Sequence, residues 1–144
     1  MKRLAVAAVA WIGLVLGGVT AETLRPSGLV KVFTGGNGEK VTVVFLEPYK
    51  RNRVLIKFEG VTGDWEGKIL MHTRENRPGV DDYRAFIDGK PYVSLVGRAR
   101  GGTMRYELYA PGLASGPIAV SYDPEESKKA LGARVVYEFT TPGE

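Results

Sequence analysis

The chain of 144 residues has no cysteine and only one histidine. The absence of cysteine excludes disulfides, thiol catalysis and thiolate metal sites. A single histidine offers no second imidazole for a zinc site, and Glu75 is the only carboxylate close to His72 in the sequence. We therefore expect no metal and no cofactor, and a fold held together by core packing alone.

Long hydrophobic runs are also absent, apart from one at the start of the chain. Lys2 and Arg3 precede the apolar segment 4–19, and small or short side chains at 19–21 precede Glu22. This order is typical of a cleaved secretory signal peptide. The alternative is a membrane anchor, but the run is short of the roughly 20 apolar residues that cross a bilayer.

The sequence thus predicts a leader of residues 1–21 and a single β-rich domain of residues 22–144. We expect this domain to be soluble, without a membrane span, and to be periplasmic or secreted. Its charge is low, because loss of Lys2 and Arg3 reduces the 20 basic side chains to 18 against 16 acidic ones. An excess of this size gives no support for nucleic-acid binding.

Short apolar or alternating segments, separated by glycine, proline and asparagine, fill the rest of the chain. This pattern predicts an all-β antiparallel fold. Asp88-Gly89 favours a two-residue hairpin, because both central residues of that turn need a positive φ. The segment 41–46, which is apolar except for the hydroxyl of Thr42 and rich in β-branched residues, predicts a strand that is covered on both faces. Nine strands are predicted: 29–33, 41–46, 54–59, 68–74, 83–87, 92–96, 103–109, 117–122 and 133–140.

One helix is predicted in the segment DPEESKKALG, residues 123–132. Asp123 can cap it, Pro124 suits its first position and Gly132 can end it. We expect a two-turn connector across one end of the sheet. The predicted fold is a single antiparallel β-sandwich with one short connecting helix. A small β-barrel is the alternative, since the sequence carries no signal for sheet closure.

The histidine and a pair of aspartates are the first candidates for a catalytic site. In the segment 68–74, alternation puts Ile69 and Met71 on the core face, so we predict that His72 points to solvent and is not a catalyst. Asp81 and Asp82 are adjacent and should point to opposite faces of a strand. We expect them to end a loop and to balance neighbouring arginines.

The only tryptophan after the leader is Trp65, in the turn GDWEG. Its ring could stack on a sugar while Asp64 and Glu66 accept hydroxyl hydrogens. Alternatively, it packs on the rim of the core. As a glycosidase pair, the two carboxylates lack the apolar pocket that raises the pKa of one of them.

Two basic clusters complete the candidates, one in PYKRNR (48–53) and one in GRARGGTMR (97–105). Arginines beside an aromatic residue can bind phosphate or sulfate, whereas a solvated turn is the simpler interpretation. The candidate ligand-binding residues are Tyr49, Lys50, Arg51, Arg53, Trp65, Arg98 and Arg100.

Together these features predict an exported, non-catalytic binding module for a protein, a glycan or an anionic envelope component. Two alternatives remain. One is a small glycan-active enzyme that uses Asp64, Glu66 or the Asp81–Asp82 pair. The other is a structural subunit of the envelope that assembles through its sheet edges.

Overall fold

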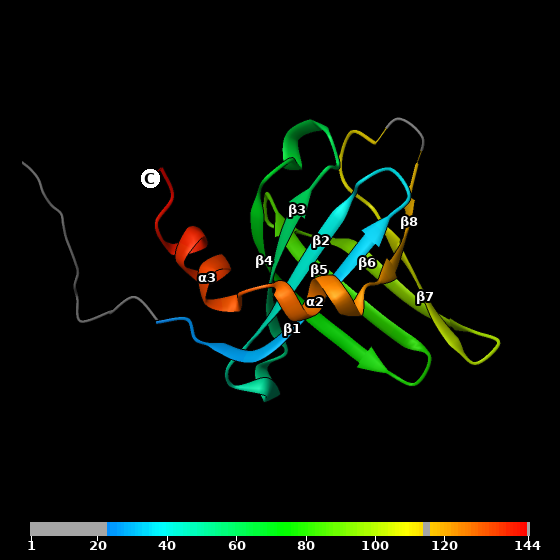
Figure 1. Ribbon diagram of the computed structural model, residues 1–144, viewed down its shortest axis with the longest axis horizontal. Coiled ribbons are helices and arrows are strands. Elements are labelled where there is room, and N and C mark those ends of the chain that lie inside the picture. Colours follow the sequence, from blue (N-terminus) through cyan, green and yellow to red (C-terminus); the bar gives the residue numbers. More distant parts are fainter. Residues whose placement is uncertain (1–22, 114–115, 144) are drawn as a thin grey trace, which may run out of the picture.

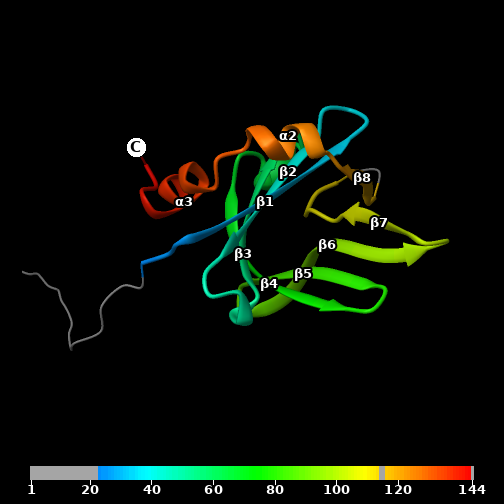
Figure 2. The same ribbon diagram turned by 60° about the horizontal axis from the view of Figure 1, so that its bottom comes forward.

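A computed structural model describes residues 23–113 and 116–143, and the predicted leader lies outside these residues. The described chain forms a barrel of eight antiparallel strands with two helices on its outer surface (Figures 1 and 2). The strands are β1 (Pro26–Gly35), β2 (Lys40–Leu46), β3 (Arg53–Glu59), β4 (Ile69–Arg77), β5 (Val80–Ile87), β6 (Lys90–Arg100), β7 (Thr103–Leu108) and β8 (Ile118–Tyr122). The helices are α2 (Pro124–Lys129) and α3 (Gly132–Thr140), with short 3₁₀ turns η3 (Tyr49–Arg51) and η4 (Gly63–Trp65).

Each strand pairs with the next along the chain, and β1 pairs with β8 to close the sheet. The predicted all-β antiparallel fold is therefore confirmed, but the architecture is the barrel and not the sandwich. Closure depends on a short seam, in which only residues 33–35 of β1 pair with 120–122 of β8. The neighbouring β7–β8 ladder is equally short and ends at the Tyr106–Val120 pair.

Tight turns join most of the neighbouring strands. Asp88 and Gly89 have φ values of 52° and 78°, and Ile87 pairs with Lys90 across them, which confirms the predicted two-residue hairpin. Gly101-Gly102 joins β6 to β7 in the same way. The β2–β3, β4–β5 and β6–β7 connections lie at one end of the barrel, which we call the mouth. In Figure 1 they lie at the bottom and right.

Large side chains fill the barrel interior, among them Phe33, Phe58 and Tyr83, each at most 1% exposed. A second apolar cluster lies between the outer face of the barrel and α3. Strand β2 contributes to both, with Val43 in the interior and Val44 under the helix. The prediction of a strand covered on both faces is confirmed.

The prediction of a ninth strand over 133–140 is wrong, because this segment is the helix α3. Val135, Val136 and Phe139 recur at helical spacing, and they pack against Val44 and Leu55 of the barrel wall. The adjacent β-branched residues suggested a strand, but burial of one helical face decides the conformation here.

Gly132 was expected to end the helix that begins after Asp123. Instead it is the first residue of α3. A Cβ atom at this position would lie 3.1 Å from Cγ1 of Val44 and 3.2 Å from Cγ2 of Val30. The missing side chain therefore lets the start of α3 approach the wall closely.

Helix α2 forms as predicted, with the Asp123 side chain accepting a hydrogen bond from the Glu126 amide at 3.0 Å. It covers the closing seam. The Val32 amide donates to Oγ of Ser127 at 2.8 Å, and the Asp123 amide donates to the Val32 carbonyl at 2.8 Å. Neither α2 nor α3, the two helices in the described ranges, has the length and apolar character of a membrane span.

Candidate functional site at the barrel mouth

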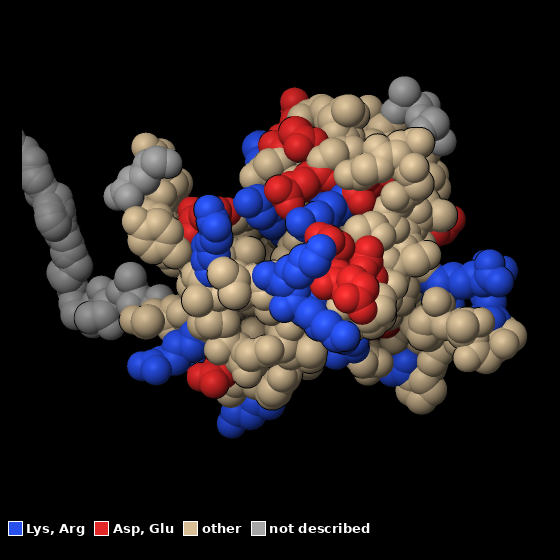
Figure 3. Space-filling view, viewed as in Figure 1, with Lys and Arg blue, Asp and Glu red and all other residues tan. Residues whose placement is uncertain are grey.

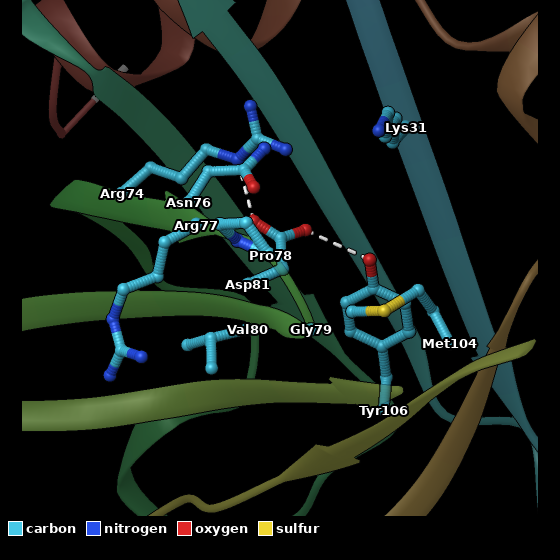
Figure 4. A pocket seen from close by; sticks show the side chains of 10 residues that line it. All are labelled: Lys31, Arg74, Asn76, Arg77, Pro78, Gly79, Val80, Asp81, Met104 and Tyr106. Carbon is cyan, nitrogen blue, oxygen red and sulfur yellow. Dashed lines mark hydrogen bonds and ion pairs between the residues drawn. The ribbon is translucent and has the colours of Figure 1, made fainter. Parts of the chain in front are cut away.

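A cavity of about 490 Å³ opens at the mouth (Figure 4). It is bordered by strands β1, β4, β5 and β7 and by the β4–β5 turn. Its lining residues are Lys31, Arg74, Asn76, Arg77, Pro78, Gly79, Val80, Asp81, Met104 and Tyr106. Both charge signs thus meet beside the Tyr106 ring, at one end of a barrel whose interior is otherwise mainly apolar.

Asp81 is the centre of a hydrogen-bond network and is only 3% exposed. Its carboxylate accepts from Nε of Arg74 at 2.7 Å, from the hydroxyl of Tyr106 at 2.8 Å and from that of Tyr83 at 3.1 Å. A buried carboxylate is tolerated when it is paired and hydrogen-bonded in this way. The network fixes the positions of both the guanidinium and the phenol ring at the cavity wall.

Tyr106 reaches Asp81 because the residue opposite it on β6 is Gly97. A Cβ atom on Gly97 would lie 2.6 Å from Cε2 of the Tyr106 ring and 3.0 Å from the Asp81 carbonyl oxygen. Glycine inside a strand often marks a close approach of this kind. Here it makes room for the aromatic ring across the inner face.

Two cations approach the same aromatic ring. The guanidinium carbon of Arg74 lies 5.1 Å from the centre of the Phe45 ring, and Nζ of Lys31 lies 5.7 Å from it. Figure 4 shows Lys31 entering the cavity from β1 and Arg74 from β4. Both distances are within the range of a cation–π contact, so the buried ring of Phe45 contacts both charges from the core side.

The electrostatic balance of the cavity is positive. Burial raises the pKa of Tyr83 and of Tyr106, so both phenols are neutral near pH 7 and act as donors to Asp81. Burial alone would lower the pKa of Arg74, but its hydrogen bond to Asp81 and nearby negative charge outweigh this and raise it. Asp81 is the one carboxylate among the lining residues, against the cations of Lys31, Arg74 and Arg77. Within the described chain no carboxylate forms an ion pair with Lys31.

A second cavity of about 510 Å³ continues the first toward the side of the barrel. The two share Lys31, Met104 and Tyr106, and the second is also bordered by Tyr122, which is 50% exposed. It lies where the β7–β8 ladder has ended, so the wall is open between residues 103–105 and β8. The mouth therefore extends into a side opening with an apolar rim.

The structure corrects the role predicted for the aspartate pair. Asp81 and Asp82 lie inside β5, which begins at Val80, so they do not end a loop. They point to opposite faces as predicted, with Asp81 inward and Asp82 paired with Arg98 on the outer face. Charge balance by arginine is confirmed for Asp81, whose partner is Arg74.

The prediction that His72 points to solvent is wrong, because its side chain is only 1% exposed. Nδ1 lies 2.9 Å from the Leu70 carbonyl oxygen and Nε2 lies 2.6 Å from Oγ of Ser94. Ser94 sits at a register shift between β5 and β6, where a bulge places an extra residue. This histidine is an interior residue below the mouth and does not line the cavity.

Of the two interpretations of Trp65, the structure shows the packed one, which corrects its inclusion among the candidate ligand-binding residues. The side chain is 5% exposed, and its ring centre lies 4.8 Å from that of Phe58 and 5.3 Å from that of Tyr92. Burial of a large aromatic ring in the core is strongly favourable. Trp65 closes the end of the barrel opposite the mouth and offers no ring face to a ligand.

Glu66, considered above as part of an acid pair, has a structural role. It accepts hydrogen bonds from the amides of Gly60, Val61 and Thr62, which lower its pKa although partial desolvation opposes them. A general acid needs a raised pKa. The turn around Trp65 therefore gives no support for a glycosidase pair.

The basic side chains of the two clusters are exposed except that of Arg53, and none of them lines the mouth cavity. Tyr49, Lys50 and Arg51 form the turn η3 between the paired strands β2 and β3, and Tyr49 is 57% exposed. Arg53 is partly buried and donates to the Glu47 carbonyl at 3.1 Å. Arg98 and Arg100 lie on the outer face at the end of β6.

Sequence reasoning missed the three residues that define the mouth, Lys31, Arg74 and Tyr106. One signal was available in LVKVF, where a lysine interrupts an otherwise apolar strand. Within residues 23–113 and 116–143, no group of histidine and acidic side chains could hold a metal ion. Comparison with protein families, curated proteins and solved structures found no match for this chain.

Proposed function

We propose that this protein is an exported, non-catalytic binding module that takes the anionic group of a small organic acid into the barrel mouth. One observation carries the proposal: Lys31 and the terminal nitrogens of Arg74 border an open cavity without a carboxylate or carbonyl partner in the described chain. A carboxylate or phosphate would supply that partner through charge-assisted hydrogen bonds.

The mouth is organised in advance for this contact. Asp81 holds Nε of Arg74 at 2.7 Å, which orients the guanidinium and leaves its two terminal nitrogens for a ligand. Phe45 supports both cations from below. Such preorganisation reduces the entropy lost on binding. Because side chains fill the barrel below Tyr83, the geometry favours a ligand of about the size of one sugar ring.

Binding is favoured over catalysis by the state of the candidate acids and bases. Asp81 is buried and already accepts three hydrogen bonds from side chains of the protein, so its carboxylate is engaged within the wall of the cavity. His72 is buried below the cavity with both nitrogens engaged. Assembly through sheet edges is less favoured than a binding role. In a closed barrel every strand is paired on both sides over part of its length, which leaves no full edge strand to pair with another molecule.

The test is calorimetric titration of the mature protein with D-glucuronate and, separately, with inorganic phosphate. Lys31→Met should weaken the binding of whichever anion the wild type takes by about 10- to 100-fold, as expected for one charge-assisted contact. Lys90→Met is the matched control, because it removes one exposed lysine at the opposite end and should leave affinity unchanged. Absence of binding for both anions, or equal affinity in wild type and Lys31→Met, would refute the proposal.

A further inference from the structure

The outer face of the β6–β7 hairpin carries a second positive site, which adjoins the mouth cavity at Arg77 and Val80. Arg98, Arg100 and Arg105 border a groove of about 320 Å³ on this face. Val96, Ala119 and Tyr106 also line it, together with one carboxylate, Glu107, which accepts a hydrogen bond from the Tyr109 hydroxyl at 3.1 Å. In Figure 3, blue atoms gather at the right edge of the molecule over this hairpin, whereas the face over α2 mixes blue and red.

The strand register places three of the arginines in one line across the sheet. Arg77 pairs with Val80, Val80 with Arg98, and Arg98 with Arg105. Neighbouring strands lie about 4.8 Å apart, so this arginine row (Arg77, Arg98 and Arg105) spans about 14 Å across β4 to β7. Arg100 lies one step nearer the mouth on the same face as Arg98.

Two arginines at this site form no ion pair with an acidic side chain in the part of the chain that the structure describes, although Glu107 lines the same groove. Asp82 is 7% exposed and holds Arg98 through a pair of contacts, one of them 3.2 Å from Nη2 to Oδ2. Arg77 pairs with Glu75 at 3.0 Å. Within the described chain, no carboxylate forms an ion pair with Arg100 or Arg105.

Placing Arg105 directly opposite Arg98 is unfavourable, because like charges on facing positions of neighbouring strands repel each other. Arg98 is held by Asp82 and Arg105 faces it across the strands, and a row of negative charges beside the groove that they border would relieve this repulsion. The cations are spread along a line and do not converge on one point, which fits a linear polyanion better than a single small anion.

We propose that the arginine row together with Arg100 binds a linear acidic polysaccharide that runs across strands β4 to β7. Such a polymer repeats a carboxylate or sulfate along its length and has flat sugar rings that can lie on the groove floor. The choice of a glycan over a nucleic acid rests on the export that is part of the proposed function. The contact should be salt-sensitive, since all the arginines except the one held by Asp82 are widely exposed.

The experiment measures binding of the mature protein to alginate, a linear polymer of uronic acids, by biolayer interferometry at 50 and 500 mM NaCl. Arg100→Gln/Arg105→Gln is the test variant, because within the described chain neither residue forms an ion pair whose loss would disturb the fold. Lys68→Gln/Lys90→Gln is the control, since it removes the same charge from exposed positions at the opposite end. Neutral dextran serves as the uncharged polymer.

We expect wild type and the control to bind alginate and not dextran, with affinity falling at high salt, and the test variant to bind at least tenfold more weakly. Equal weakening of test and control variants would overturn the inference, because only net charge would then matter. Tighter binding to a single-stranded DNA oligonucleotide than to alginate would overturn the assignment to a glycan. Loss of alginate binding in Lys31→Met but not in the test variant would overturn the arginine row and leave the mouth as the binding site.

Discussion

Replacement of His72 tests the buried position that the structure assigns to this side chain. The Leu70 carbonyl can only accept a hydrogen bond, so Nδ1 carries the proton and donates to it at 2.9 Å. Nε2 then accepts from the hydroxyl of Ser94 at 2.6 Å. The imidazole is thus neutral with both nitrogens satisfied, and protonation would place a charge in the barrel interior.

The size of the effect follows from the pKa of this imidazole. Burial lowers the pKa of His72 from 6.5 to about 4, although the hydrogen bond to the Leu70 carbonyl acts in the opposite direction. The unfolded chain therefore binds the proton more tightly than the folded one. The resulting stability is fully present above pH 6.5 and is lost as the pH falls toward 4. Linkage gives a loss of about 3 kcal/mol over this range.

Urea denaturation at pH 7.5 and pH 4 of wild type and His72→Gln measures this contribution. The variant should be less stable at pH 7.5 but should lose about 3 kcal/mol less on acidification. The loss of stability on acidification in the variant is subtracted from the loss in wild type. This difference cancels the contribution of the carboxylates, because they titrate in both proteins. The charge of the neighbouring Arg74 is constant over this pH range. Parallel losses in the two proteins, or an NMR titration of His72 near pH 6.5, would show that the side chain is in contact with water.

Three further predictions concern other parts of the chain. Gly97→Ala should displace the Tyr106 ring from Asp81 and lower the free energy of unfolding by about 1–3 kcal/mol, measured by urea denaturation. Trp65 should emit at a blue-shifted wavelength in the mature protein, and Trp65→Ala should destabilise it by about 3–5 kcal/mol; a solvent-like emission maximum would argue against its packing. The exported protein should begin at Glu22, which intact mass of the secreted material tests, and a mass that retains residues 1–21 would refute cleavage.

Local sequence signals were sufficient for most of the secondary structure. Alternation and turn residues identified eight strands, and Asp88-Gly89 identified its hairpin, because these features depend on residues close together in the chain. Barrel closure was not predictable, since it depends on pairing between β1 and β8, about 90 residues apart in sequence. Because closure was not predicted, the sequence also did not show that inward-facing residues of β1, β4, β5 and β7 meet at the mouth.

The errors at His72 and at α3 have one cause. Ile69 and Met71 seemed to mark the core face of β4, but they lie on the outer face and pack in the cluster beneath α3. With α3 taken as a strand, nothing remained to cover that outer face. His72 was therefore predicted to point to solvent, although it faces the barrel interior. One face of β4 points into the barrel and the other packs beneath α3, so both are buried. The alternation of residues along the strand cannot tell which of these two faces points into the barrel.

The short seam between β1 and β8 has a consequence for the order in which this chain acquires its structure. Seven of the eight strand pairings join neighbours and can form as the chain emerges, but the eighth waits for residues 118–127, which supply β8 and the Ser127 contact to Val32. Until then the sheet has two unprotected margins on which foreign strands can add. Nascent or truncated chains that end before Ile118 should therefore be prone to aggregation, while completion of residues 118–127 removes both margins at once.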